Sequence, residues 1–283
     1  MDNRAIGFFD SGLGGLTCIP HLLREFPHER VVYFGDTART PYGSKDPSTI
    51  RKFAAEMADF LIEEKNVKMV VIACNTVSAV ALEYLRDRHP ATPFLGIVSP
   101  ASHAAAKTCT PENRIGVIGT KATIQSGAYN KKVTGLAPSL KVYSMACPAL
   151  VPLIEEGIVD SDIMDMTIEH YMKPFVSANE IDTLVLGCTH YPFIRRNIER
   201  LYPQLRIIDP SEEILLSVAD ALDRHGLQAG EGGTDHVFYA SDLSENFVNI
   251  INIIFSEAQH PIKFDVLDLE SHPVRKERKE RTL

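Results

Sequence analysis

The stretch Val70-Val71-Ile72-Ala73-Cys74-Asn75-Thr76 decides the fold class of this 283-residue chain. Residues 69–73 are apolar and largely β-branched, and the run is too short for a helix, so it predicts a buried parallel strand. Residues 78–86 predict the helix that follows. Cys74 therefore lies where a strand ends and a helix begins, which is the usual place for ligand chemistry in an open α/β sheet.

A second stretch repeats this pattern, and it reads Leu184-Val185-Leu186-Gly187-Cys188-Thr189-His190-Tyr191-Pro192. An apolar strand again runs into a cysteine, and hydrogen-bonding side chains follow at once. The two cysteines are 114 positions apart (188 minus 74). The repetition suggests two similar domains related by pseudo-symmetry, and we expect Cys74 and Cys188 to face each other across one pocket.

The composition is that of an ordinary globular protein, with 45% hydrophobic and 23% charged residues. The formal net charge of −8 provides no basic excess, which argues against nucleic acid as the main partner. The N-terminal residues lack the apolar region of a signal peptide, and the longest apolar runs fall far short of the roughly 20 residues of a membrane-spanning helix. We therefore expect a cytoplasmic protein without a membrane partner.

The first strand is predicted at residues 5–9, and the glycine-rich turn Asp10-Ser11-Gly12-Leu13-Gly14-Gly15-Leu16-Thr17 follows it. Glycines allow a ligand to approach the backbone closely, and free N–H groups at a helix start favour an anion. The turn lacks the lysine and the glycine spacing of a phosphate-binding loop, so a plain strand–helix turn stays an alternative. Asp10 ends the strand and is expected to face the ligand crevice.

A second strand is predicted at residues 30–35, and the loop Asp36-Thr37-Ala38-Arg39-Thr40-Pro41-Tyr42-Gly43 follows it. This loop is either an ordinary turn or a segment whose backbone amides contact a ligand. A helix should begin near Pro47, with Asp46 as its N-cap, and it should continue over residues 52–65.

The middle of the chain predicts a second series of strands and helices. Residues 93–98 are predicted as a fourth strand, and Ser99-Pro100-Ala101 breaks the pattern where one domain is expected to end. Strands are then expected at 114–118, 140–144, 183–187 and 206–208, and a helix at 162–177. Thr120 follows the first of these strands, which is a modest signal for ligand contact.

The last part of the chain indicates a return to the first domain, with helices at 214–225 and 245–258 and strands at 236–240 and 262–267. Together the elements predict an α/β fold of two similar domains with mainly parallel sheets flanked by helices, and an active site between the domains. The expected boundaries are 1–97 plus 209–270 for the first domain and 98–208 for the second. Residues 271–283 carry mixed charges and are expected to form a solvated tail.

The positions of the five cysteines limit the kinds of site and reaction that the chain can support. None of the five cysteines forms a C-x-x-C pair, so the sequence predicts neither a disulfide framework nor a structural metal site. A helix N-terminus stabilises a thiolate, which distinguishes Cys74 and Cys188, while Cys18, Cys109 and Cys147 are expected to be structural.

Two thiols on opposite sides of a carbon atom could invert its configuration. One thiol would remove a proton from one face, and the other would deliver a proton to the opposite face. The pKa of a free thiol is about 8.5, so a modest shift of this pKa would let one cysteine act as base and the other as acid near neutral pH.

Several motifs in order carry a resemblance to a known family. They include residues 9–15, the loop 36–43, Ala73-Cys74-Asn75-Thr76 and Gly187-Cys188-Thr189-His190-Tyr191-Pro192. Residues 116–124 and 151–157 fit as well. The chain resembles bacterial glutamate racemases, of the aspartate/glutamate racemase superfamily, from residue 6 to about residue 255. Cys18 and Ala149 stand where bulkier residues are expected in this family, but neither belongs to the residues assigned to catalysis.

This resemblance implies a racemase that interconverts L- and D-glutamate without a cofactor or a metal and supplies D-glutamate for peptidoglycan. It implies that Cys74 and Cys188 form the acid/base pair and that Asp10 and His190 assist them. It also implies substrate contacts at Asp10, Ser11, Pro41, Tyr42, Gly43, Asn75, Thr76, Thr120, Glu155, Thr189 and His190. Glutamate is the expected partner, and a homodimer is left open.

Three alternatives stay open from the sequence. One is a racemase of the same superfamily that acts on aspartate or another amino acid, because the sequence shows the depth of the pocket poorly. Another is a thiol hydrolase or amidase that uses Cys188 with His190 and tolerates the loss of Cys74. The last is an amino-acid-binding protein without catalysis, in which both cysteines are dispensable.

Overall fold

Two parallel sheets form the framework of the computed structural model, which describes residues 1–230, 235–255 and 264–271. The larger sheet has six strands in the order β10-β9-β2-β1-β3-β4, and every neighbouring pair is parallel. Its strands are β1 (Ile6–Asp10), β2 (Val31–Gly35), β3 (Met69–Ile72), β4 (Phe94–Gly96), β9 (Val237–Ala240) and β10 (Phe264–Val266). The end of the chain therefore returns to the first sheet, as the sequence predicts.

Helices cover both faces of this sheet because its central strands are apolar on both sides. Phe9, Phe34 and Ile72 pack against one layer of helices, whereas Phe8, Tyr33 and Val71 pack against the other. The first layer is α2 (Pro47–Asp59), η3 (Phe60–Glu64) and α3 (Asn75–Arg88). The second is η1 (Gly14–Thr17), α1 (Cys18–Glu25), α10 (Pro210–His225) and α11 (Glu245–Ile254). We call this sheet with these helices the six-stranded unit.

The smaller sheet has the order β6-β5-β7-β8, again with parallel pairs. Its strands are β5 (Arg114–Gly119), β6 (Lys141–Ala146), β7 (Thr183–Gly187) and β8 (Arg206–Ile208). One face carries α4 (Val98–Thr108) and α6 (Ala128–Leu136). The other carries α7 (Leu150–Glu155), α8 (Asp162–Asn179), η4 (Tyr191–Ile194) and α9 (Arg195–Leu201). We call this sheet, its helices and α5 (Lys121–Ser126) the four-stranded unit.

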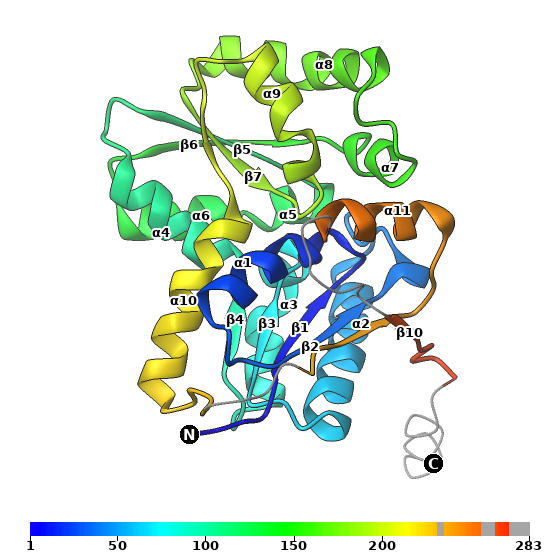
Figure 1. The fold of residues 1–283 in the computed structure, drawn as a ribbon. Helices are drawn as coiled ribbons and strands as arrows, with labels where there is room; N and C mark the ends of the chain where they lie inside the picture. The colour runs from blue at the N-terminus through cyan, green and yellow to red at the C-terminus, as the bar shows by residue number, and fades with distance from the viewer. Residues whose placement is uncertain (231–234, 256–263, 272–283) are drawn as a thin grey trace.

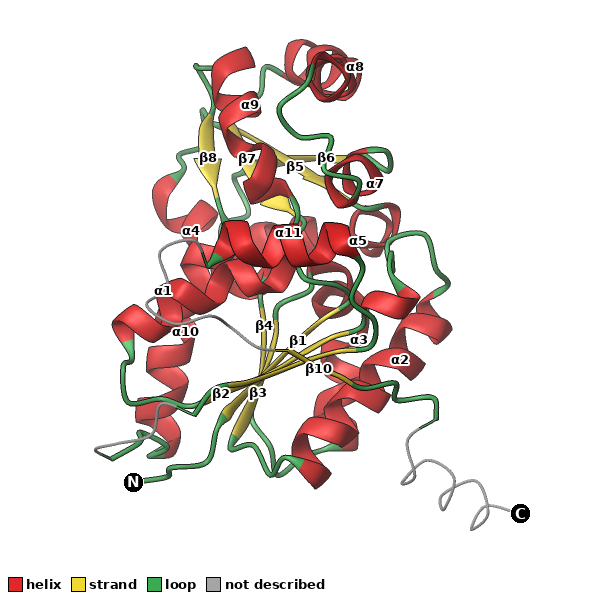
Figure 2. Ribbon diagram, turned by 45° about the vertical axis from the view of Figure 1, so that its right-hand side comes forward, coloured by secondary structure: helices red, strands yellow, loops and turns green. Residues whose placement is uncertain are grey.

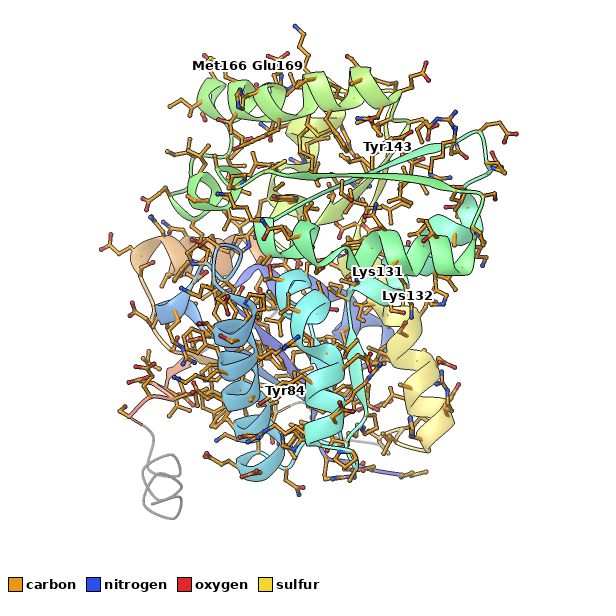
Figure 3. The ribbon with its side chains drawn as sticks, turned by 180° about the vertical axis from the view of Figure 1, so that it is seen from behind. Tyr84, Lys131, Lys132, Tyr143, Met166 and Glu169 are labelled. Carbon is orange, nitrogen blue, oxygen red and sulfur yellow. The ribbon has the colours of Figure 1, made fainter. Side chains whose placement is uncertain are left out.

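The two units are stacked, with the four-stranded unit above the six-stranded unit in Figure 1. Helix α11 runs along the junction between them (Figures 1 and 2), and Asn246 on α11 donates to Glu156, just after α7, at 3.5 Å. Figure 3 shows the outer surface, where Met166 and Glu169 point away from α8 into solvent. The predicted α/β class, with two parallel sheets flanked by helices, is confirmed.

The chain around residue 98 differs from the prediction. The strand predicted at 93–98 is the shorter β4, and α4 begins at Val98, so Ser99-Pro100-Ala101 belongs to the first turn of a helix. A proline fits a first helical turn, where its missing N–H is not needed, and for this reason it does not mark a break here. Helices α5 and α6 were not predicted, and the domain boundaries at 97/98 and 208/209 stay predictions.

Most other elements agree with the sequence. Asp46 caps α2 and accepts from the N–H of Ser48, as expected, although the helix predicted over 52–65 changes to the π-type turn η3 at Phe60. The helix predicted at 214–225 begins earlier, at Pro210, behind the N-cap Asp209. Residues 256–263, in the predicted last helix and strand, and 272–283 of the predicted tail lie outside the described residues. Within the described ranges, none of the helices has the length and apolar character needed to span a membrane.

Candidate active site

A small cavity lies between the two units, where the central strands of both sheets end. It has room for about 20 Å³, close to that of one water molecule. Loops after β1, β2 and β3 meet loops after β5 and β7 around it. Its walls are formed by Ser11, Thr40, Pro41, Tyr42, Gly43, Cys74, Asn75, Thr76, Thr120, Val151, Cys188, Thr189 and His190.

Cys74 enters the cavity from the six-stranded unit as the N-cap residue of α3. It is 4% exposed, and its Sγ lies 3.3 Å from the Oγ of Ser11. Burial, and next the carboxylate of Asp10, raise the pKa of the Cys74 thiol well above its ordinary value, although the hydrogen bond to Ser11 lowers it. Cys74 is therefore a protonated thiol at neutral pH.

Cys188 enters from the four-stranded unit, at the end of β7, and is the first member of a chain of polar groups. Its Sγ lies 3.8 Å from Nδ1 of His190, and Nε2 of His190 lies 3.1 Å from Oε1 of Glu155. Burial alone would lower the pKa of His190, but its hydrogen bonds to Cys188 and Glu155 raise that pKa well above the ordinary value. The imidazole is therefore positively charged at neutral pH and stands directly beside the sulfur.

Asp10 lies behind the cavity wall. It is fully buried, and its carboxylate accepts from the N–H of Ser11 at 2.7 Å, the N–H of Gly15 at 2.6 Å and the hydroxyl of Thr189 at 3.3 Å. The glycine turn also packs closely against the four-stranded unit, because a Cβ at Gly14 would lie 2.6 Å from Oγ1 of Thr189. The turn thus holds a carboxylate of the protein and joins the two units, in addition to presenting Ser11 to the cavity.

The loop 36–43 is fixed by buried polar contacts. The hydroxyl of Tyr42 donates to Asp36, and Nε of Arg39 donates to the same carboxylate at 2.7 Å. The loop tip touches the other unit, because the carbonyl of Gly43 accepts from the N–H of Ala122 at 2.9 Å. A Cβ at Gly43 would lie 2.4 Å from the Cβ of Thr120, so only glycine allows this approach.

Three threonine hydroxyls close the opposite wall. Oγ1 of Thr76 lies 2.9 Å from that of Thr120 and 3.2 Å from that of Thr123, and the last two are 3.0 Å apart. Thr76 belongs to α3 of the six-stranded unit, whereas Thr120 caps α5 of the four-stranded unit. The cluster therefore joins the units and offers hydroxyl groups to the cavity.

The structure brings together all the predicted site residues except two. Asp10 and Glu155 do not line the cavity and instead contact groups that do. The sequence analysis did not select Thr40 or Val151. Thr40 lies in the loop 36–43, and its hydroxyl donates to Glu155 at 3.2 Å. Its position beside Pro41 and Tyr42 could have identified it from the sequence as a site residue. Val151 begins the motif 151–157 that carries part of the resemblance, but its apolar side chain gave no chemical reason to select it. The role of every site residue stays a prediction.

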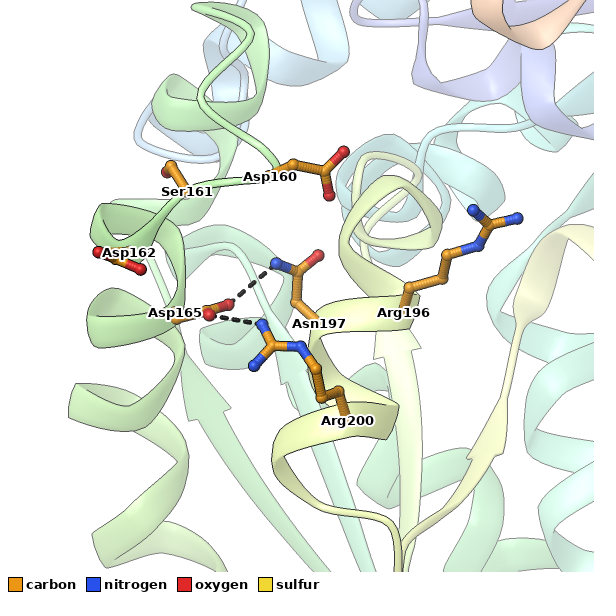
Figure 4. Close-up of a pocket in the computed structure, with 7 residues that line it drawn as sticks. All are labelled: Asp160, Ser161, Asp162, Asp165, Arg196, Asn197 and Arg200. Carbon is orange, nitrogen blue, oxygen red and sulfur yellow. Dashed lines mark hydrogen bonds and ion pairs between the residues drawn. The ribbon is translucent and has the colours of Figure 1, made fainter.

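Two wider hollows elsewhere have a different character. Figure 4 shows one of about 320 Å³ between α8 and α9, in which Asp165 accepts from Asn197 at 2.9 Å and from Arg200 at 2.5 Å. The other, of about 440 Å³, lies beside α2 and α3, and there Arg88 pairs with Asp59. Each hollow contains one such charged pair near the surface, and neither is lined by a cysteine.

Comparisons with known proteins identify the family of the chain. A family model described as Asp/Glu/Hydantoin racemase matches residues 16–216. The chain is 41% identical to the glutamate racemase of Streptococcus uberis over 91% of this chain and 97% of that one. The glutamate racemase of Geobacter metallireducens is also 41% identical, over 89% of this chain and 93% of its own.

Solved structures give the same result. The crystal structure of glutamate racemase from Francisella tularensis in complex with D-glutamate has a TM-score of 0.87 and 35% identity, and covers 96% of this chain and 100% of that one. The aspartate racemase of Picrophilus torridus, at 18% identity and a TM-score of 0.54 over 80% of this chain and 96% of its own, shares the fold alone. The chain therefore belongs to the Asp/Glu/hydantoin racemase family and, within it, to the glutamate racemases.

Proposed function

We propose that this protein interconverts L- and D-glutamate by a two-cysteine acid/base mechanism. One observation carries the proposal: Cys74 and Cys188 line the same small cavity, and each comes from a different sheet. An amino acid held between them would present one face of its α-carbon to each sulfur. Inversion needs this arrangement, whereas a hydrolase needs only one of the two thiols.

In the proposed reaction, the thiolate of one cysteine takes the α-proton and becomes a thiol. The thiol of the other cysteine gives its proton to the opposite face of the α-carbon and becomes a thiolate. One C–H bond breaks and one forms, and no electrons are gained or lost. The two cysteines exchange protonation states, and the reverse reaction uses them in the opposite order.

The free protein is prepared for one of these two directions. Cys74 carries its proton, because burial and the carboxylate of Asp10 disfavour the thiolate there. The imidazole of His190 lies 3.8 Å from the sulfur of Cys188, within reach of a proton that this sulfur gains or loses. We infer that Cys188 acts as the base and Cys74 as the acid in the first turnover of the resting protein.

The cavity binds carboxylates through neutral donors. Among the described residues that line it there is no lysine or arginine, but hydroxyls of Ser11, Thr76, Thr120 and Thr189 are present. Such donors in an enclosed site bind an anion strongly because water is excluded. Since the cavity has room for about one water molecule, we expect the two units to move apart when an amino acid enters.

Glutamate is the favoured substrate because the similar structure from Francisella tularensis contains D-glutamate. D-glutamate is a component of peptidoglycan, and we propose that the product supplies its synthesis. Aspartate is the main alternative, and it is shorter by one methylene group. The sequence-based expectation that no cofactor is required is part of the proposal.

Circular dichroism of L-glutamate with the purified protein tests the proposal directly. The signal should decay to zero as the racemate forms, with no cofactor added, and D-glutamate should give the mirror-image decay. L-aspartate under the same conditions should change much more slowly. Release of ammonia, or faster conversion of aspartate than of glutamate, would contradict the proposal.

A further inference from the structure

One residue that lines the cavity carries a buried hydrogen-bond donor without a partner. Nδ2 of Asn75 has no hydrogen-bond partner, although Asn75 is only 2% exposed. Within the described part of the chain, it is the only buried side-chain nitrogen or oxygen of this kind on a residue that lines the cavity. An unpaired buried donor is costly unless a ligand accepts from it, so Asn75 is prepared to bind an acceptor atom.

The other end of the same amide is held by a residue that the sequence analysis did not select. The hydroxyl of Tyr129 donates to Oδ1 of Asn75 at 2.6 Å. Tyr129 is 2% exposed, and burial raises the pKa of its hydroxyl, so the group keeps its proton and acts as a donor. Because an amide group is planar and rigid, fixing Oδ1 also fixes the direction of Nδ2.

Tyr129 belongs to the opposite unit. It lies on α6, where Tyr129 and Val133 are buried against the four-stranded sheet, while Lys131 and Lys132 face solvent (Figure 3). Asn75 opens α3 of the six-stranded unit. The hydrogen bond between them crosses the junction, so the amide has its fixed direction only when the two units are together.

We propose that Tyr129 is a positioning residue that turns the amide of Asn75 so that Nδ2 donates to a carboxylate of the substrate. This inference rests on the proposed function. Without the Tyr129 hydroxyl, the amide of Asn75 is free to rotate and to present Oδ1 to the cavity. An oxygen in that place repels a carboxylate, and the site then binds glutamate less tightly.

The test measures KM and kcat of racemisation for Tyr129→Phe, which keeps the ring and removes the hydroxyl. We expect KM for glutamate to rise about tenfold, the factor typical of one lost hydrogen bond to a charged group, with a much smaller change in kcat. Asn75→Ala should raise KM at least as much. Adding Tyr129→Phe to Asn75→Ala should have no further effect on KM, because Tyr129 acts through Asn75.

Val133→Ala is the matched control, since it loosens the same helix one turn further along and leaves the Tyr129 hydroxyl in place. It should lower the melting temperature without raising KM. An unchanged KM in Tyr129→Phe, an equal rise in Val133→Ala, or additive effects in the double variant would each overturn the inference. Failure of the wild-type protein to racemise glutamate would instead refute the proposed function.

Asn75→Asp gives a second test that does not depend on the folding of Tyr129→Phe. The new carboxylate still accepts from Tyr129, but it presents a negative oxygen where Nδ2 stood. KM for glutamate should therefore rise more than in Asn75→Ala. A KM close to the wild-type value in Asn75→Asp would show that Nδ2 does not contact a substrate carboxylate.

Discussion

Cys74 and Cys188 end corresponding strands of two sheets, but their surroundings differ in charge. Cys74 has a neutral hydroxyl at 3.3 Å and the buried carboxylate of Asp10 behind it, whereas Cys188 has a charged imidazole at 3.8 Å. A similar backbone arrangement thus holds two chemically different thiols. In the proposed mechanism, this difference means that one thiol begins as the acid and the other as the base, although the reaction runs in both directions.

The largest effect should come from removing either thiol. Cys74→Ala and Cys188→Ala should each lower the rate of racemisation by about 10³-fold or more in both directions, because every turnover needs one acid and one base. Cys109→Ala is the control, since Cys109 is also buried but does not line the cavity. The measurement is circular dichroism from both enantiomers, and a Cys74→Ala rate near that of the wild type would refute the two-base mechanism.

Deuterated water sharpens the same prediction. At low conversion of L-glutamate, the D-glutamate product should carry solvent deuterium at the α-carbon from the first turnovers, while recovered L-glutamate should remain largely undeuterated. D-glutamate should give the mirror result. A single base that served both faces would return part of the original proton to the product, which mass spectrometry would detect.

The next effect concerns the neighbours of the two thiols. His190→Asn and Asp10→Asn should lower kcat by about 10²-fold, and more than they weaken substrate binding, because they act mainly on proton transfer. Since the two enantiomers have equal free energy, kcat/KM must remain equal in the two directions. The asymmetry should therefore appear in kcat and in the isotope effect measured with α-deuterated substrate. His190→Asn should show the larger isotope effect with one enantiomer, and Asp10→Asn should show it with the other.

Equal isotope effects in both directions would contradict this assignment. If, in addition, the losses followed substrate affinity alone, His190 and Asp10 would be binding residues. The double variant, in contrast, should show raised isotope effects from both enantiomers.

A smaller effect is expected at Ser11. Its hydrogen bond lowers the pKa of Cys74, so Ser11→Ala should raise that pKa further and lower kcat by about tenfold or less. Asp10→Asn removes a group that raises the same pKa, so Ser11→Ala should change the isotope effect in the opposite direction to Asp10→Asn. Ser102→Ala removes another buried hydroxyl, one that donates to the carbonyl of Val98 away from the cavity, and it should leave both quantities unchanged.

The smallest effect concerns stability and pH. The pKa of His190 is raised in the folded protein above its ordinary value of about 6.5, so above that pH the folded state binds more protons than the unfolded state. This contribution is complete below pH 6.5 and is lost as pH rises through the folded pKa. His190→Asn should therefore show a flatter decline of melting temperature above about pH 6.5 than the wild type. His103→Asn, at an exposed histidine, should keep the wild-type slope.

The sequence was sufficient to locate both cysteines, because a strand that runs into a polar stretch is a local pattern. It did not show that Asp10 lies behind the residues that line the cavity, since that depends on how the amide of Gly15 folds back onto its carboxylate. The start of α4 was missed because Pro100 resembles a break when the helix around it is unknown. Tyr129 was missed because α6 was not predicted and because its contact with Asn75 joins residues of two units that are 54 positions apart in the sequence.

The close approach of Gly43 and Thr120 also limits how related sequences can vary. A larger residue at position 43 needs a smaller residue at position 120, so these two positions should change together during evolution. Both residues also line the cavity, and a compensating pair of changes would therefore alter the space around the substrate. A pair of substitutions can therefore preserve the contact between the two units and still be selected for or against, because it changes which substrate the cavity prefers.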